Sequence, residues 1–146
     1  MKIISSIALL SLFIAGCALT YSPPEGSFAP VSRVHSANTE NLINKAKNII
    51  ASEGFAIQVF DKSGGFMSTA GRDIKLSKDE ADCGTTMGIN YLSDNRTRTK
   101  LAINVFVDDN QIKISAIIEG FYGPQDTSLK CISKGLIEKR FLGKIL

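Results

Sequence analysis

The chain contains very little of the chemistry on which most enzyme and metal sites depend. Among its 146 residues there is one histidine, His35, and there are three cysteines. A Ser-His-Asp triad or a zinc site would have to use His35, which lies in a stretch rich in proline and serine and is expected to be solvated there. The sequence therefore predicts no metal, no cofactor and no catalytic residue.

The chain also has only a small excess of positive over negative charge. The formal net charge is +3, and it falls to +2 if residues 1–16, which include Lys2, are removed. A nucleic-acid-binding domain carries a stronger and more clustered positive charge, so nucleic acid is not an expected partner. The densest basic group is Arg96, Arg98 and Lys100, whose spacing places them on one side of a strand. They are interpreted as a solvated strand edge, with contact to an anionic lipid or lipopolysaccharide as the alternative.

The acidic residues form no evident catalytic pair. Asp79, Glu80 and Asp82 lie in a polar stretch, and Asp108-Asp109 lies where a tight turn is expected. The first group lacks the spacing and the glycine of an EF-hand calcium loop. We therefore expect a protein that is not an enzyme. A hydrolase of cell-wall polymers that uses Asp79, Glu80 and Asp82 is the weakest of the functional hypotheses.

The one long apolar run stands at the start of the chain. Lys2 precedes it, Ile3 to Phe13 is apolar except for its serines, and Ile14-Ala15-Gly16-Cys17 follows. About a dozen residues are too few to cross a hydrocarbon core, which requires roughly twenty, but they have the length of the apolar core of a signal peptide. Beyond this run, no window of the sequence is long and apolar enough for a transmembrane helix.

Residues 1–17 resemble the signal peptide and lipobox of bacterial prolipoproteins, in which an aliphatic residue, a small residue, and Gly or Ala precede a cysteine. The resemblance implies export, cleavage before Cys17, and fatty acylation of its sulfur and of the new N-terminus. Two or more acyl chains anchor a protein stably to a membrane. Ala18 stands where, in enterobacterial-type sorting, an aspartate retains lipoproteins in the inner membrane. The resemblance thus implies an outer-membrane lipoprotein. We expect its domain in the periplasm, with the outer surface of the cell as the alternative. The alternatives are an uncleaved anchor, or an ordinary signal peptide followed by a coincidental cysteine.

The other two cysteines favour the same compartment. With Cys17 acylated, Cys83 and Cys131 remain as an even pair, and in an oxidising compartment we expect them to form a disulfide. The alternative is two buried free thiols. Their distance in the sequence excludes a catalytic CxxC motif.

Composition divides the mature chain into two parts. Residues 17–37 contain Pro23-Pro24 and several serines without periodicity, which predicts a lipidated cysteine followed by a flexible tether. Residues 38–146 then form a single globular domain. It is expected to begin with a helix capped by Asn38 or Thr39 and ended by Gly54. The apolar face of this helix consists of Leu42, Ile43, Ala46, Ile49 and Ile50.

After this helix the apolar period changes to two, which predicts antiparallel strands. Residues 55–60 and 66–71 flank one turn, and residues 101–108 and 112–119 flank another. Asp109-Asn110 between the last two is expected to take left-handed backbone positions in a tight turn. Thr85 to Leu92 is a further expected strand, which Gly88 weakens.

A final helix is expected from Asp126 or Thr127 onward, with Cys131 near its start and Gly135 in its interior. The expected fold class is therefore α+β: an N-terminal helix, an antiparallel meander of four or five strands, and a C-terminal helix packed on one sheet face. This order resembles the helix-grip arrangement, which also occurs in the C-subunit of the outer-membrane β-barrel assembly machinery. The likeness is one of element order only, and no residue roles follow from it.

Two binding functions fit these features. The first is a non-catalytic outer-membrane lipoprotein that acts as a protein-interaction or envelope-assembly subunit, with the membrane and another envelope protein as partners. The alternative is a small-ligand or lipid binder with a cavity between the sheet and the final helix. The residues expected to line that cavity, which also fit plain core positions, are Phe60, Phe66, Phe106, Phe121 and Tyr122.

Overall fold

The chain folds as a mixed α+β structure, and the computed structural model describes residues 21–26 and 30–146. Its elements in chain order are β1 (Tyr21–Ser22), β2 (Val31–Val34), α1 (Thr39–Ser52), β3 (Ile57–Asp61), β4 (Phe66–Thr69), β5 (Arg72–Asp73), β6 (Ala81–Asp82), β7 (Thr85–Thr86), β8 (Ile89–Asn90), η1 (Tyr91–Ser93), β9 (Thr97–Val107), β10 (Gln111–Tyr122), η2 (Gly123–Gln125), β11 (Thr127–Lys130), β12 (Ile132–Ser133) and α2 (Leu136–Ile145). The lipobox and Cys17 lie outside the described residues.

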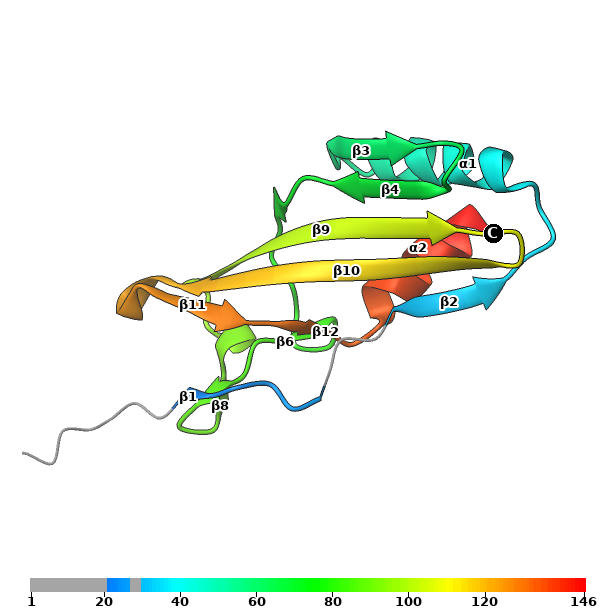
Figure 1. Ribbon diagram of the computed structural model, residues 1–146. Helices are drawn as coiled ribbons and strands as arrows, with labels where there is room; N and C mark the ends of the chain where they lie inside the picture. The colour runs from blue at the N-terminus through cyan, green and yellow to red at the C-terminus, as the bar shows by residue number, and fades with distance from the viewer. Residues whose placement is uncertain (1–20, 27–29) are drawn as a thin grey trace, which may run out of the picture.

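The long hairpin of β9 and β10 forms the centre of the main sheet (Figure 1). Every second residue of both strands is buried, which is the alternation expected of a sheet with one face on the core. The main path runs β11-β10-β9-β4-β3, with β2 paired to β10 and β5 paired to β9, and all these pairs are antiparallel. Of the expected strands, β3, β4, β9 and β10 form this meander, and three strands that were not expected, β2, β5 and β11, extend it.

The turn between β9 and β10 closes differently from the prediction. Asp109 and Asn110 were expected in left-handed positions, but the only non-glycine residues with positive φ in the described part of the chain are Met87 and Asp126. The Asp108 carboxylate instead accepts hydrogen bonds from the backbone N–H of Asn110 (2.9 Å) and of Gln111 (2.7 Å). An aspartate side chain thus closes the turn without left-handed backbone.

Local sequence signals account well for α1. The side chain of Asn38 accepts a hydrogen bond from the N–H of Asn41 (3.1 Å), which satisfies one of the free donors at the helix start. Gly54 follows the helix with a φ of +86°, a backbone conformation that L side chains rarely adopt. The residues of α1 that are buried are Leu42, Ile43, Ala46 and Ile50.

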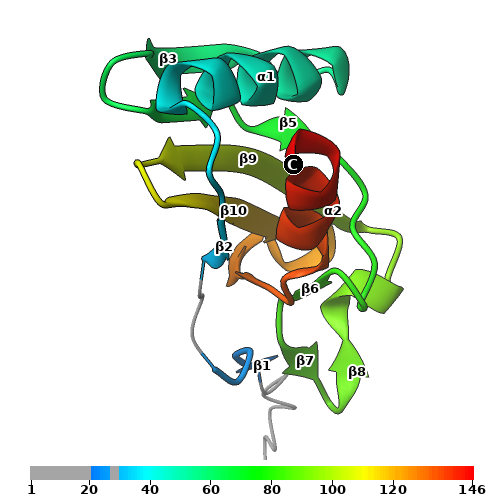
Figure 2. The ribbon, with the colours of Figure 1, turned by 90° about the vertical axis from the view of Figure 1, so that its right-hand side faces the viewer.

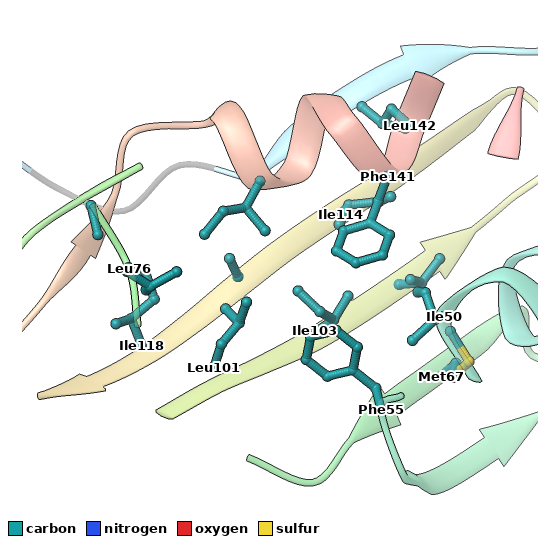
Figure 3. Packing of buried hydrophobic residues seen from close by; sticks show 14 of the residues in the cluster. Ile50, Phe55, Met67, Leu76, Leu101, Ile103, Ile114, Ile118, Phe141 and Leu142 are labelled. Carbon is teal, nitrogen blue, oxygen red and sulfur yellow. The ribbon is translucent and has the colours of Figure 1, made fainter. Parts of the chain in front are cut away.

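Both helices pack on the same face of the sheet. α1 contacts β9 and β4, α2 contacts β10, and the two helices contact each other. Figure 3 shows Phe141 of α2 pointing between Ile114 of β10 and Ile103 of β9, and these three side chains are essentially inaccessible to solvent. The rings of Phe141 and Phe55 meet edge to face at 5.9 Å. The sheet and both helices therefore share one core.

The sequence prediction placed the start of the final helix too early, and the structure corrects it. Residues 127–130 form β11 and pair with the end of β10, and residues 132–133 form β12 and pair with β6. Gly135 is not in a helix interior: with a φ of +83° it is the residue before α2. Leu129 fits the buried side of a strand as well as a helix stripe, so the apolar spacing alone did not separate the two. Pairing with β10 decides it, because a strand supplies partners for the backbone groups along that edge.

Two further segments differ from expectation. Residues 85–92 are not one strand but a hairpin of β7 and β8 followed by η1, with Met87 and Gly88 in its turn. Residues 17–37 were expected to be a flexible tether. Within the described part of that range, Tyr21–Ser22 pair with β7 and Val31–Val34 pair with β10. The segment before α1 is thus attached to the domain at two places.

Candidate functional site

One face of the main sheet is not covered by either helix. We call the face opposite α1 and α2 the open face; it is turned toward the viewer in Figure 1, and in Figure 2 it is the side away from α2. Its side chains come from the residues of β9 and β10 that alternate with the buried ones. A solvent-facing sheet surface is normally polar, so its apolar members are the informative ones.

Exposed apolar side chains lie at two places on the open face, with Asn104 of β9 and its strand neighbours Ser68 and Ser115 between them. Phe106 of β9 is 41% exposed and lies opposite Phe66 of β4, while Ile117 of β10 is 46% exposed and lies opposite Ala102 of β9. Val59 of β3 is 49% exposed. A strict period of two from Ile57 would place Val59 on the core side. A bulge between Ile57 and Val59 turns Val59 toward the open face instead. We call Val59, Phe66, Ala102, Phe106 and Ile117 the apolar strip.

A row of charges of alternating sign lies beside the apolar strip. Asp73 of β5 faces Lys100 of β9, Lys100 faces Glu119 of β10, and Glu119 faces Lys130 of β11. Opposite charges on directly paired residues of neighbouring strands favour the pairing. This charged row thus carries fixed charges of both signs across four strands, directly next to exposed apolar side chains.

Shallow hollows lie on both sides of the charged row. One, of about 550 Å³, is lined by Lys100, Glu119, Phe121 and their neighbours, and the other, of about 390 Å³, is lined by Lys100, Glu119, Ile117 and theirs. The Arg98 guanidinium lies 4.9 Å from the centre of the Phe121 ring in the first hollow. The open face is therefore uneven enough to seat side chains of another molecule.

The aromatic residues predicted to line one cavity do not come together. Phe66 and Phe106 face each other at one end of the open face, and Phe121 lies at the other end, beside Arg98. Phe60 points to the helix side, with the Lys47 ammonium 4.5 Å from its ring centre. Tyr122 follows Phe121 in β10 and is therefore on the opposite face, where it is 7% exposed. The space between the sheet and α2 is filled by the core residues of α2, among them Ile137, Phe141, Leu142 and Ile145.

The basic group predicted from its spacing is divided. Arg98 and Lys100 share the open face, but Arg96 lies ahead of β9 in an ion pair with Asp94. The Arg96 guanidinium donates to both Asp94 oxygens and to the Tyr122 hydroxyl, and that hydroxyl donates to Asp94 (3.0 Å). The hydrogen bond from Arg96 holds the pKa of Asp94 well below its usual range, and burial raises the pKa of Tyr122. Arg96 thus joins the loop before β9 to the end of β10.

Two of the three carboxylates weighed for a hydrolase, Glu80 and Asp82, have other partners. Glu80 accepts hydrogen bonds from the N–H (3.0 Å) and hydroxyl (3.1 Å) of Ser77, and it lies 3.7 Å from Arg140. Asp82 accepts a hydrogen bond from the N–H of Gly84 (2.8 Å). Among the side chains that the structure describes, no group of three or more His, Cys, Asp or Glu residues is arranged to hold a metal ion. The contacts of Glu80 and Asp82 stabilise the loop around β6.

Cys83 and Cys131 form the disulfide expected from the sequence. It joins the segment after β6 to the segment between β11 and β12, and Cys83 is fully buried. Gly120 of β10 lies beneath it: a Cβ at this position would come within 2.6 Å of the Cys131 sulfur and 3.1 Å of Leu129. A glycine is therefore required where the disulfide crosses the strand.

The sequence analysis did not predict the roles of two structurally important residues, Ile117 and Glu138. Ile117 interrupts the polar side of β10, and this isolated isoleucine between Ser115 and Glu119 was the available signal. Glu138 of α2 is fully buried, with its carboxylate accepting hydrogen bonds from the Ala116 N–H (3.1 Å) and the Ser133 hydroxyl (2.7 Å). Nothing local in the sequence marks a glutamate as buried, because its partners lie on other elements.

Neither helix in residues 21–26 and 30–146 is long and apolar enough to cross a bilayer. Comparison of the chain with protein-family models and with curated proteins found no match.

Proposed function

We propose that this protein is a non-catalytic lipoprotein of the bacterial outer membrane that binds another envelope protein through its open face, as an interaction or assembly subunit. Fatty acylation of Cys17 would hold it to the membrane with the domain in the periplasm. The resemblance of residues 1–17 to a lipobox supports this address. The disulfide between Cys83 and Cys131 supports it too, because disulfides persist in oxidising compartments.

The apolar strip beside the charged row is the observation that carries the binding proposal. Three large apolar side chains on it, Val59, Phe106 and Ile117, are between 41% and 49% exposed although the helix side of the sheet has a complete core. Large apolar side chains that are exposed together on one face and bordered by polar residues are typical of interaction sites. The charged row presents charges of both signs in a fixed order. A folded protein can place charges of the opposite sign against each of them, as protein interfaces commonly do. The proposed partner is therefore a protein with an apolar patch flanked by charges of both signs.

Acylation is tested by the mass of the mature protein purified from its native host. We expect a chain that begins at Cys17 and carries the added mass of its fatty acyl groups. The Cys17→Ser variant should lose the acyl mass and should no longer float with membranes in a density gradient. Wild-type protein that retains Met1, or that is recovered without acyl mass, would contradict the proposed address.

Partner binding is tested by placing a charge in the apolar strip. Ile117→Asp should reduce recovery of the partner by at least tenfold, which corresponds to about 1.4 kcal/mol, because a charge at the centre of an interface must be desolvated. Leu136→Asp is the matched control, since Leu136 is equally exposed (48%) but begins α2. The measurement is quantitative co-purification after cross-linking in intact cells. If both variants lose partner recovery equally, or if neither loses any, the partner does not bind through the open face.

The hollow beside Arg98 favours a second candidate, a binder of a small amphiphile with charged groups of both signs. Its volume of about 550 Å³ falls in the usual range for ligand sites, and its lining combines the cations Arg98 and Lys100, the carboxylates Asp73 and Glu119, and the Phe121 ring. The same variants separate this candidate from the first. Ile117 does not line this hollow, so a ligand function there would survive Ile117→Asp.

A further inference from the structure

The β7–β8 hairpin ends in an exposed apolar tip. Met87 and Gly88 form its two-residue turn with φ values of +49° and +77°, and Ile89 begins β8. The exposed fractions are 77% for Met87 and 63% for Ile89, so these side chains contribute little to the core. We call Met87, Gly88 and Ile89 the hairpin tip.

The residue types at the hairpin tip are not those that the backbone prefers. A two-residue turn with positive φ at both positions strongly favours Asn, Asp or Gly, and methionine is unusual at the first position. A Cβ added at Gly88 would meet no atom of the described chain within 4 Å, so the tip stands clear of the rest of the domain. The sequence from Gly84 to Ser93 also contains no charged residue. The tip is thus apolar, uncharged and free to enter an apolar environment.

The hairpin tip lies next to the start of the described chain. β1 pairs antiparallel with β7, and Tyr21 is directly opposite Thr86, the residue before Met87. The N-terminal end of β1 is therefore on the same side as the tip. Only residues 18–20 separate Tyr21 from Cys17, and a chain of that length spans at most about 14 Å. An acyl group on Cys17 would keep Tyr21, the strand partner of Thr86, within about this distance of the bilayer and so hold the tip near it.

β1 is firmly attached to the hairpin, so the short connection constrains the whole domain. Gly84 has a φ of +84°, and a Cβ there would collide with the carbonyl oxygen of Ser22, which shows how closely the two segments approach. The Tyr21 ring lies 5.8 Å from that of Tyr91, which is almost fully buried (2% exposed). A rotation of the domain about its anchor would therefore carry the hairpin with it.

We propose that the hairpin tip inserts into the interface of the bilayer in which Cys17 is anchored, and so fixes the orientation of the domain on the membrane. The inference rests on the proposed acylation of Cys17. A lipid bilayer fits the tip because two exposed apolar side chains, in a segment without charged residues, are held beside β1, which begins four residues after Cys17. In this orientation β1, β7 and β8 lie against the lipid, and α1, at the opposite end of the molecule in Figure 2, points away from it.

The absence of tryptophan from the chain allows a direct test. Ile89→Trp places a single fluorophore at the hairpin tip, and Val34→Trp places one at a control position on β2, where Val34 is 80% exposed. Each full-length variant, processed by its native host, is reconstituted in vesicles of phosphatidylethanolamine and phosphatidylglycerol with brominated acyl chains. We expect the bromines to quench emission at position 89 at least twofold more strongly than at position 34. Adding Met87→Asp to the Ile89→Trp chain should return quenching to the control level.

Intact mass of the same samples separates this inference from the proposed acylation. Acylated protein with equal quenching at both positions would overturn membrane contact by the tip and leave acylation standing. Selective quenching at position 89 in protein without acyl mass would support membrane contact and refute acylation. Unacylated protein without selective quenching would refute both. An emission shift at position 89 in native envelope membranes, without quenching in pure lipid, would assign the tip to a protein partner and overturn the inference.

Discussion

Replacing both Cys83 and Cys131 with alanine is expected to lower the free energy of unfolding by about 4 kcal/mol. The disulfide closes a loop between residues 48 positions apart, and the chain-entropy model assigns about this value to a loop of that length because the cross-link restricts the unfolded chain. In a domain of this size such a loss lowers Tm by roughly 15 °C. Urea unfolding followed by circular dichroism measures the change.

The control for the disulfide is the wild-type protein unfolded in the presence of a reducing agent. It should show the same loss as the double alanine variant, whose unfolding should not respond to the reducing agent at all. A reduced wild type that unfolds at the same urea concentration as the oxidised protein would contradict the prediction. Since the bond joins the loop after β6 to the segment between β11 and β12, hydrogen exchange should accelerate there first.

The Glu138→Ala variant is expected to be less stable than the wild type by about 3 kcal/mol. Glu138 is fully buried, and its carboxylate accepts hydrogen bonds from the Ala116 N–H of β10 and from the Ser133 hydroxyl. Each buried donor that loses its partner costs about 1–3 kcal/mol. Residues 111–114 of β10 pair with β2 and residues 119–122 pair with β11, so Ala116 lies between these two partners along the same edge. Equilibrium unfolding in urea measures the loss.

Two further variants show whether the hydrogen bonds of Glu138 are responsible. Glu138→Gln retains an acceptor for the Ala116 N–H and should lose less than half as much stability as Glu138→Ala. Lys139→Ala, at the exposed neighbouring position of α2, should stay within about 0.5 kcal/mol of the wild type. If Glu138→Ala also falls within that range, the buried carboxylate does not stabilise the fold as argued.

The sequence was most reliable where residues close in the chain decide the structure. Asn38 caps α1, the apolar residues of the helix follow a period near 3.6, and the alternation of β9 and β10 separates a core face from a solvent face. The disulfide was predictable because only one pair of cysteines remains after Cys17. Each of these features depends on contacts within a few residues or on a simple count.

The tertiary structure decided features whose signal lies on distant elements. Leu129 suits a helix or a strand equally well, and pairing with β10 made it part of β11. The bulge in β3 turned Val59 to the open face, and the hydrogen bond from Ala116 accounts for the burial of Glu138. The position of the hairpin tip beside β1 follows from pairing between Tyr21 and Thr86, 65 positions apart.

The sequence by itself thus determined the class of fold, the central hairpin, the first helix and the disulfide, because these follow from short-range periodicity, from capping and from the number of cysteines. Only the tertiary structure decided which strands flank the central hairpin, which charges stand in a row across four strands, and which end of the domain lies beside the N-terminal segment. These depend on strand pairing between residues far apart in the chain, where the favourable contacts exist only after the whole sheet has formed.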